Sequence, residues 1–180
     1  MIKKWKTISS EYIYMHRPWG VLRKDHVQTS SGFDIPNYYV LEYPDWVNVL
    51  GITTDNQIVL IKQYRHALGV IAFELPAGVI DEGEEPLVAA KREMLEETGY
   101  GNGEWKAYMQ LCANPATHTN LTHCFIATGL EKVQEQELEN SEEIEVQLFE
   151  LADVKQILLN NEMPQALQAA ALWRFIAEMA

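Results

Sequence analysis

Three glutamates, Glu93, Glu96 and Glu97, lie close together in a segment that has the features of a helix. Residues three and four positions apart are neighbours on a helix surface, so these carboxylates share one face and repel one another. They also fall in the last turns, where the helix dipole disfavours each negative charge by about 0.3–1 kcal/mol. A hard divalent cation bound by their oxygen atoms would offset the repulsion. The alternative interpretation is a solvated acidic face.

The helix that positions these carboxylates is predicted to begin at Pro86 and to end before Gly99. Proline suits the first helical position because its missing N–H would have no partner there. Glycine suits the end because it readily adopts the left-handed conformation that closes a helix. The expected apolar stripe consists of Leu87, Ala89, Ala90 and Met94.

Composition restricts the classes of function. The chain has 180 residues, of which 47% are hydrophobic, enough for one domain with a sizeable core or for a domain with a small addition. A formal net charge of −12 argues against a nucleic-acid partner, which would need a basic surface. Neither an apolar run of membrane-spanning length nor a signal peptide is predicted. Cys112 and Cys124 are interpreted as buried free thiols, and a cytoplasmic location is expected.

The order of expected elements predicts a mixed sheet between helices, an α/β fold. Residues 1–43 are expected to form a small N-terminal β-sheet region and residues 44–180 the main domain. Asp55 and Asn56 provide the turn of a hairpin. Predicted strands cover residues 11–16, 21–29, 38–43, 46–53, 57–64, 72–75, 105–113, 121–128 and 144–148. Predicted helices after the central one cover residues 151–159 and 164–179, and the acidic residues 129–143 are expected to be a loop.

The residues around the glutamates resemble the Nudix box. Gly78, five residues, Glu84, seven residues and Arg92-Glu93 are followed by apolar Met94, Glu96-Glu97, Gly99 and apolar Tyr100. All defined positions of the box are filled. The resemblance implies a Nudix-type α/β/α sandwich with a mixed β-sheet. It also implies a hydrolase that cleaves a nucleoside diphosphate linked to another group.

Further residues are similar to the ADP-ribose and nucleotide-sugar pyrophosphatase branch. They are the segment 74–78 (Glu-Leu-Pro-Ala-Gly), Gln63-Tyr64-Arg65, and Pro115, sixteen residues beyond Gly99. The resemblance implies a nucleoside diphosphate sugar as substrate and a homodimer in which residues 1–43 contribute to dimerisation and substrate contacts. The sequence departs from the pattern of this branch at two places. Asn140 stands where related enzymes often have a second acid, which leaves the choice of the general base open. The sequence after Pro115 is Ala-Thr-His-Thr-Asn, which leaves the identity of the sugar open.

The same resemblance implies roles for individual residues. Mg²⁺, or Mn²⁺ as an alternative, would be bound by Glu93, Glu97, Glu96 and the backbone carbonyl of Ala77. The catalytic residues would be Glu142 as first choice for the general base, Glu139 as second choice, and Glu96. Apart from the resemblance, the chemistry of Arg65 suits a bidentate phosphate clamp, and a surface arginine without a role is an equal alternative. Arg65, Trp46 and Pro115 are the residues expected to contact the substrate. Structural support is expected from Gly78, Glu84, Arg92 and Gly99, with Gly78 interpreted as a requirement of the backbone.

Two other functions remain open on sequence grounds. One is a Nudix pyrophosphohydrolase that acts on nucleoside triphosphates or dinucleotides. The other is a non-catalytic Nudix ligand sensor, which would be expected to lack some of the box glutamates, although all of them are present here.

Overall fold

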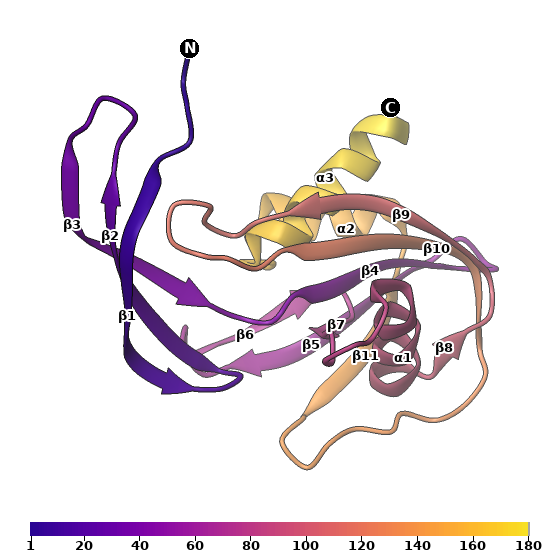
Figure 1. Cartoon of the computed structure of the whole chain (residues 1–180). Helices are drawn as coiled ribbons and strands as arrows, with labels where there is room; N and C mark the ends of the chain where they lie inside the picture. The colour runs from indigo at the N-terminus through magenta and orange to yellow at the C-terminus, as the bar shows by residue number, and fades with distance from the viewer. Residues whose placement is uncertain (180) are drawn as a thin grey trace. The chain divides into compact units, whose positions relative to one another are not determined.

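The computed structural model describes residues 1–179, which form two compact units (Figure 1). The first unit contains residues 1–44 and 112–121, and the second contains residues 45–111 and 122–179. The expected small antiparallel N-terminal sheet is confirmed, and residues 112–121 join it as an additional part of the first unit. Within residues 1–179, no helix is both long and apolar enough to cross a membrane.

The first unit is a three-stranded antiparallel sheet in the order β1 (Lys6–His16), β2 (Gly20–Gln28) and β3 (Asp34–Glu42). β1 and β3 both begin earlier than predicted. The segment 112–121 lies along β3, where the Leu41 N–H donates to the Thr117 carbonyl at 2.7 Å and the Thr119 N–H donates to the Leu41 carbonyl at 3.2 Å.

The second unit is built on an eight-stranded mixed sheet. β4 and β10 are parallel, and the other paired strands of this sheet are antiparallel. Its strands are β4 (Trp46–Thr53), β5 (Ile58–Arg65), β6 (Val70–Glu74), β7 (Ala77–Val79), β8 (Tyr100–Gly101), β9 (Glu104–Leu111), β10 (Thr122–Lys132) and β11 (Ile144–Phe149). Its helices are α1 (Pro86–Thr98), α2 (Leu151–Leu159) and α3 (Ala166–Met179).

Helices cover both faces of this sheet, as expected for an α/β/α sandwich (Figure 1). Val47 and Val49 pack with Ala90 and Met94 of α1, whereas Leu50, on the opposite face of β4, packs in the cluster of α2 and α3. Because alternate residues of a strand point to opposite faces, a strand covered on both sides is apolar throughout. This explains the largely apolar sequence of β4 and the apolar first half of β5.

Three predictions about local structure were wrong. Residues 129–132 belong to β10 and not to a loop, because a register shift at Gly129, with φ of 70°, lets the strand continue. β7 and β8 were missed because they are too short to show a pattern. Leu87 is exposed and not part of the core stripe of α1, since the buried side of that helix includes carboxylates.

Candidate metal centre

The local sequence of α1 produces its observed ends. Pro86 stands in the first turn, and Gly99 follows the last one with φ of 71°. The Gly99 N–H donates to the Leu95 carbonyl at 2.7 Å, which closes the helix in the left-handed conformation expected of glycine. The bounds predicted for this helix are therefore confirmed, and they fix the positions of the glutamates in its last two turns.

Two of these glutamates are buried against the sheet. Glu93 is 9% exposed and Glu97 is 3% exposed. Burial raises the pKa of both carboxyl groups, and most strongly that of Glu97, because it removes the charged form from water. Their mutual repulsion raises the pKa of Glu97 further. A cation bound beside the two carboxylates would favour their ionised forms.

β7 lies directly beside these carboxylates. The Ala77 N–H donates to Glu97 Oε2 at 2.9 Å. A Cβ added to Gly78 would overlap the carboxylate of Glu93. The φ of Gly78 is not positive, so this glycine provides space for Glu93 and does not supply an unusual backbone conformation. This differs from the backbone requirement that sequence similarity implied for Gly78.

Arg92 connects the helix to the preceding loop. Its Nε and Nη2 donate to the two carboxylate oxygens of Glu84 at 3.1 and 3.0 Å, and Nη2 also donates to the Val79 carbonyl at 3.0 Å. Its Nη1 donates to Glu93 at 2.7 Å and to Glu96 at 3.2 Å. The bidentate contact lowers the pKa of Glu84. Arg92 therefore orients the loop and Glu93 at the same time.

The donor set fits a hard cation of the Mg²⁺ type. Glu93 and Glu97 offer buried carboxylate oxygens, Ala77 lies beside them, and Glu96 has a side chain that is 40% exposed. Across the described residues 1–179, no three His, Cys, Asp or Glu side chains are already grouped as metal ligands. Mg²⁺ usually keeps several waters and takes only one or two carboxylates, so this smaller set is sufficient.

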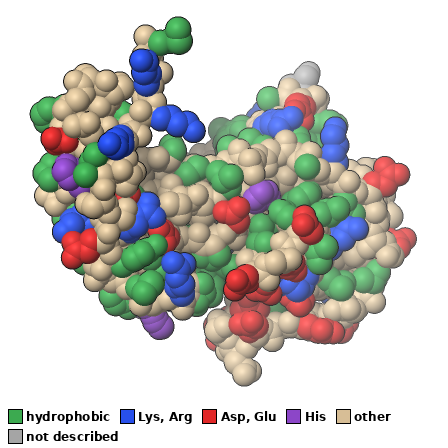
Figure 2. All heavy atoms as spheres, in the orientation of Figure 1, with side chains coloured by type: hydrophobic (Ala, Val, Ile, Leu, Met, Phe, Trp, Pro, Cys, Tyr) green, Lys and Arg blue, Asp and Glu red, His purple; other side chains and the backbone are tan. Residues whose placement is uncertain are grey.

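The loop before β11 brings a further acid to the helix. The negative charge of Glu142 adds to burial in raising the pKa of both Glu93 and Glu97, so its carboxylate lies within electrostatic range of them. Glu142 Oε2 accepts a hydrogen bond from the Glu139 N–H at 3.0 Å. Glu139 is exposed and accepts from Ser141 Oγ at 3.5 Å. Figure 2 shows acidic side chains gathered on this part of the surface.

The residues predicted to contact substrate, Arg65, Trp46 and Pro115, differ in their contacts and in the unit to which they belong. Arg65 donates from Nε and Nη2 to the carboxylate of Glu74, both at 2.6 Å. Trp46 begins β4, and its Nε1 is buried without a hydrogen-bond partner among residues 1–179. Pro115 belongs to the first unit, in the segment 112–121.

Sequence reasoning missed two polar residues behind the site. Glu74 is 2% exposed, and its carboxylate accepts a hydrogen bond from Gln168 Nε2 at 3.2 Å in addition to those from Arg65. Gln168 Oε1 accepts from the Leu75 N–H at 2.8 Å. Gln168 of α3 thus holds the chain just before β7. The one signal in the sequence was that the charged Glu74 ends an otherwise apolar strand, and nothing pointed to Gln168.

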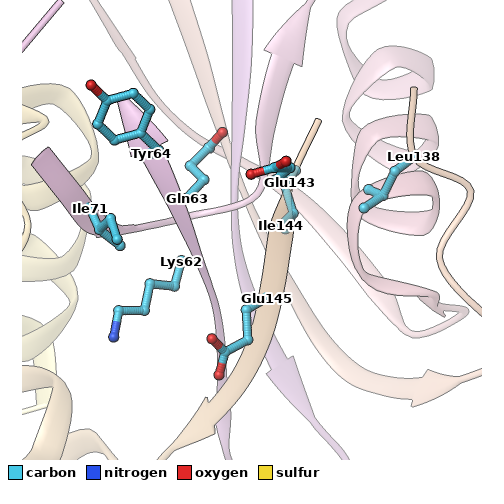
Figure 3. Close-up of a pocket in the computed structure, with 8 residues that line it drawn as sticks. All are labelled: Lys62, Gln63, Tyr64, Ile71, Leu138, Glu143, Ile144 and Glu145. Atoms are coloured by element: carbon cyan, nitrogen blue, oxygen red, sulfur yellow. The ribbon is translucent and has the colours of Figure 1, made fainter. Parts of the chain in front are cut away.

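A shallow cavity of about 550 Å³ lies beside the acidic loop (Figure 3). Gln63 and Tyr64 of β5 and Ile71 of β6 line one part, and Leu138 and Glu143 of the loop line another. Because Glu143 adjoins Glu142, this cavity opens next to the loop that approaches α1.

Comparison with known proteins agrees with this fold. Residues 43–170 match the Nudix domain, and residues 5–41 match the nucleoside diphosphate sugar hydrolase N-terminal domain. The chain therefore belongs to the Nudix family.

Two curated relatives and one solved structure illustrate the similarity. An ADP-ribose pyrophosphatase of Bacillus subtilis is 30% identical over 168 residues, which cover 93% of this chain and 90% of that protein. A methanol dehydrogenase activator of Bacillus methanolicus is 35% identical over 127 residues, or 71% and 68% of the two chains. A crystal structure of an ADP compounds hydrolase superposes with a TM-score of 0.84 at 22% identity, over 96% of this chain and 92% of that one.

Proposed function

We propose that this protein hydrolyses the pyrophosphate bond of ADP-ribose or a related nucleoside diphosphate sugar. The products are a nucleoside monophosphate and a sugar phosphate. The observation that carries the proposal is the presence of two buried carboxylates on α1 with Glu142 within electrostatic range. The similarity to an ADP-ribose pyrophosphatase along 93% of the chain supports the choice of substrate class.

Glu93, Glu97 and Glu96, with the backbone carbonyl of Ala77, would hold the divalent cation, Mg²⁺ or alternatively Mn²⁺. When bound, such ions neutralise the charge of the pyrophosphate and acidify a water molecule. Glu142 accepts the proton of the attacking water, and Glu139 is the second candidate for this role. Arg92 and Glu84 keep the loop and Glu93 in place.

Arg65, Trp46 and Pro115 are proposed to contact the substrate. The Nε and Nη2 atoms of Arg65 already donate to Glu74, so Nη1 is its donor for a phosphate oxygen. The indole N–H of Trp46, which has no partner among the described residues, offers a hydrogen bond to a bound ligand.

A homodimer in a cytoplasmic location completes the proposal. Support for dimerisation comes from exposed apolar side chains on β1, namely Ile8, Tyr12, Ile13, Tyr14 and Met15. An exposed apolar surface of this kind is typical of an interface between chains. Both cysteines are free, which suits a reducing compartment. Light scattering on the purified protein measures the number of chains directly.

A panel of nucleotides with product identification tests the activity. With Mg²⁺, we expect AMP and ribose 5-phosphate from ADP-ribose, or the corresponding pair from another nucleotide sugar. Release of inorganic pyrophosphate from nucleoside triphosphates would favour the other Nudix reaction, and ligand binding without turnover would favour a sensor. The matched control is Glu97→Gln, which should fold and lack activity.

A further inference from the structure

The loop that carries Glu142 is tied to the end of α1 at its beginning. The Val133 N–H donates to the Gly99 carbonyl at 2.9 Å, and the Glu137 N–H donates to the Glu96 carbonyl at 2.9 Å. Carbonyl groups in the last turn of a helix have no partner within that helix, so the loop supplies them. These contacts fix the first half of the loop but not residues 138–143.

One side chain connects the two ends of the remaining segment. Gln136 Nε2 donates to the backbone carbonyl of Glu97 at 2.7 Å and to the backbone carbonyl of Ile144 at 3.2 Å. Glu97 belongs to the last turn of α1, and Ile144 is the first residue of β11. The half-buried amide of Gln136 therefore holds the start of β11 against the helix that carries the candidate metal ligands.

The segment between these anchor points has few other constraints. Glu139, Asn140, Ser141 and Glu143 are exposed. Hydrogen bonds inside the segment are local, such as the one that the Glu142 N–H donates to the Glu139 carbonyl at 3.0 Å. A short polar loop of this kind gains little from burial, so its position depends on where its ends are held.

We propose that Gln136 is a positioning residue: by joining the carbonyls of Glu97 and Ile144, it holds Glu142 at the distance from α1 that catalysis requires. The inference rests on the proposed function, in which Glu142 accepts the proton of water. Both hydrogen bonds of the Gln136 amide go to backbone carbonyls of the chain itself. Because small displacements of a reacting group reduce rate more than affinity, the effect belongs mainly to kcat.

Gln136→Met tests this role, because methionine has nearly the same size and no N–H donor. We expect kcat to fall about 10- to 100-fold while KM and the concentration of Mg²⁺ giving half activity change by less than about threefold. Gln134→Met is the matched control, since Gln134 is also half-buried in this loop and, within residues 1–179, it is hydrogen-bonded through its backbone N–H alone. The control should keep kcat near wild type. Equal kcat in both variants would overturn the proposal.

A double variant shows whether Gln136 acts through Glu142. If it does, Gln136→Met should lower kcat in the wild type but add little in a Glu142→Gln background. The same fold loss in both backgrounds would overturn the proposal.

Hydrogen exchange gives a readout that does not need turnover. Amides of residues 137–143 should exchange faster in Gln136→Met than in Gln134→Met, and unchanged exchange would contradict the positioning role. An inactive wild-type protein would refute the proposed function and remove the catalytic part of the inference. The exchange result would still separately establish or reject Gln136 as the anchor of the loop.

Discussion

Gly78 and Glu93 occupy adjoining positions that leave no room for a methyl group between them. A Cβ on residue 78 would overlap the Glu93 carboxylate, which is held by Arg92 at 2.7 Å. The obstacle is the end of a flexible side chain, so the backbone of β7 need not move. The glycine of this motif thereby controls where a candidate metal ligand lies.

We therefore expect Gly78→Ala to displace the Glu93 carboxylate while the protein stays folded. Mg²⁺ affinity and turnover should both fall by about tenfold or more, as for the loss of a group that orients a metal ligand. Mg²⁺ titration of activity and circular dichroism measure the two effects. The double variant Gly78→Ala with Glu93→Asp should recover part of the affinity, since aspartate is shorter. No recovery would indicate that β7 itself had moved.

The buried acids predict how the effect of Mg²⁺ depends on pH. Burial raises the pKa of Glu97 well above 4.5, so the folded protein without metal holds a proton that the unfolded chain releases. Metal-free stability should therefore decline as pH rises from about 4.5 through the raised pKa. Mg²⁺ needs the ionised carboxylate, so the increase in Tm that it causes should grow over the same range.

Thermal unfolding at several pH values, with and without Mg²⁺, measures this dependence. In Glu97→Gln the group no longer titrates, and the amide oxygen can still accept from the Ala77 N–H. The variant should be at least as stable as the wild type without metal, and Mg²⁺ should raise its Tm far less. Glu137→Gln, at an exposed position of the loop, is the control and should behave as wild type. An undiminished Mg²⁺ effect in Glu97→Gln would argue against Glu97 as a ligand.

The assignment of the base is tested by comparing two glutamates of one loop. We expect Glu142→Gln to lower kcat by about 10²–10⁴-fold, the usual contribution of a general base. Mg²⁺ affinity should fall less than in Glu97→Gln. Glu139→Gln should have a small effect, because the Glu139 carboxylate is exposed, whereas the charge of Glu142 raises the pKa of both Glu93 and Glu97. The opposite ranking would transfer the role to Glu139.

Arg65 is expected to be required for stability as well as for substrate contact. Its removal in Arg65→Met would leave Glu74, which is 2% exposed, as a charge paired only with the amide of Gln168. Breaking a buried ion pair in this way typically costs about 3–5 kcal/mol, and the partial exposure of Arg65 places the expected loss at the low end. Urea unfolding measures it.

The double variant Arg65→Met with Glu74→Gln separates the two roles of Arg65. It should recover much of the stability, because no unpaired charge remains, yet KM should stay high. A recovered KM would mean that Arg65 has no separate role with substrate.

Local signals explain which parts of this structure were predictable. Pro86 and Gly99 mark the ends of α1 because capping depends on residues adjacent in sequence, and the apolar runs of β4 and β5 indicate strands covered on both faces. Leu87 was assigned to the core because the pattern could not show that carboxylates share the buried side of the helix. The contacts of Gln168 with Glu74 and Leu75 join residues more than ninety positions apart. No local pattern encodes such a pairing.

The first unit consists of two separate stretches of the chain, 1–44 and 112–121, and this affects how it can form during synthesis. β3 obtains its partner from residues 112–121, through the hydrogen bonds of Leu41 with Thr117 and Thr119. A ribosome releases β1 to β3 first, and residues 45–111 must follow before that partner exists. Domains otherwise tend to fold in the order of synthesis. The edge of β3 therefore stays unpaired until residues 112–121 have been made. Removal of residues 1–44 would also leave residues 112–121 without the strand that they pair with.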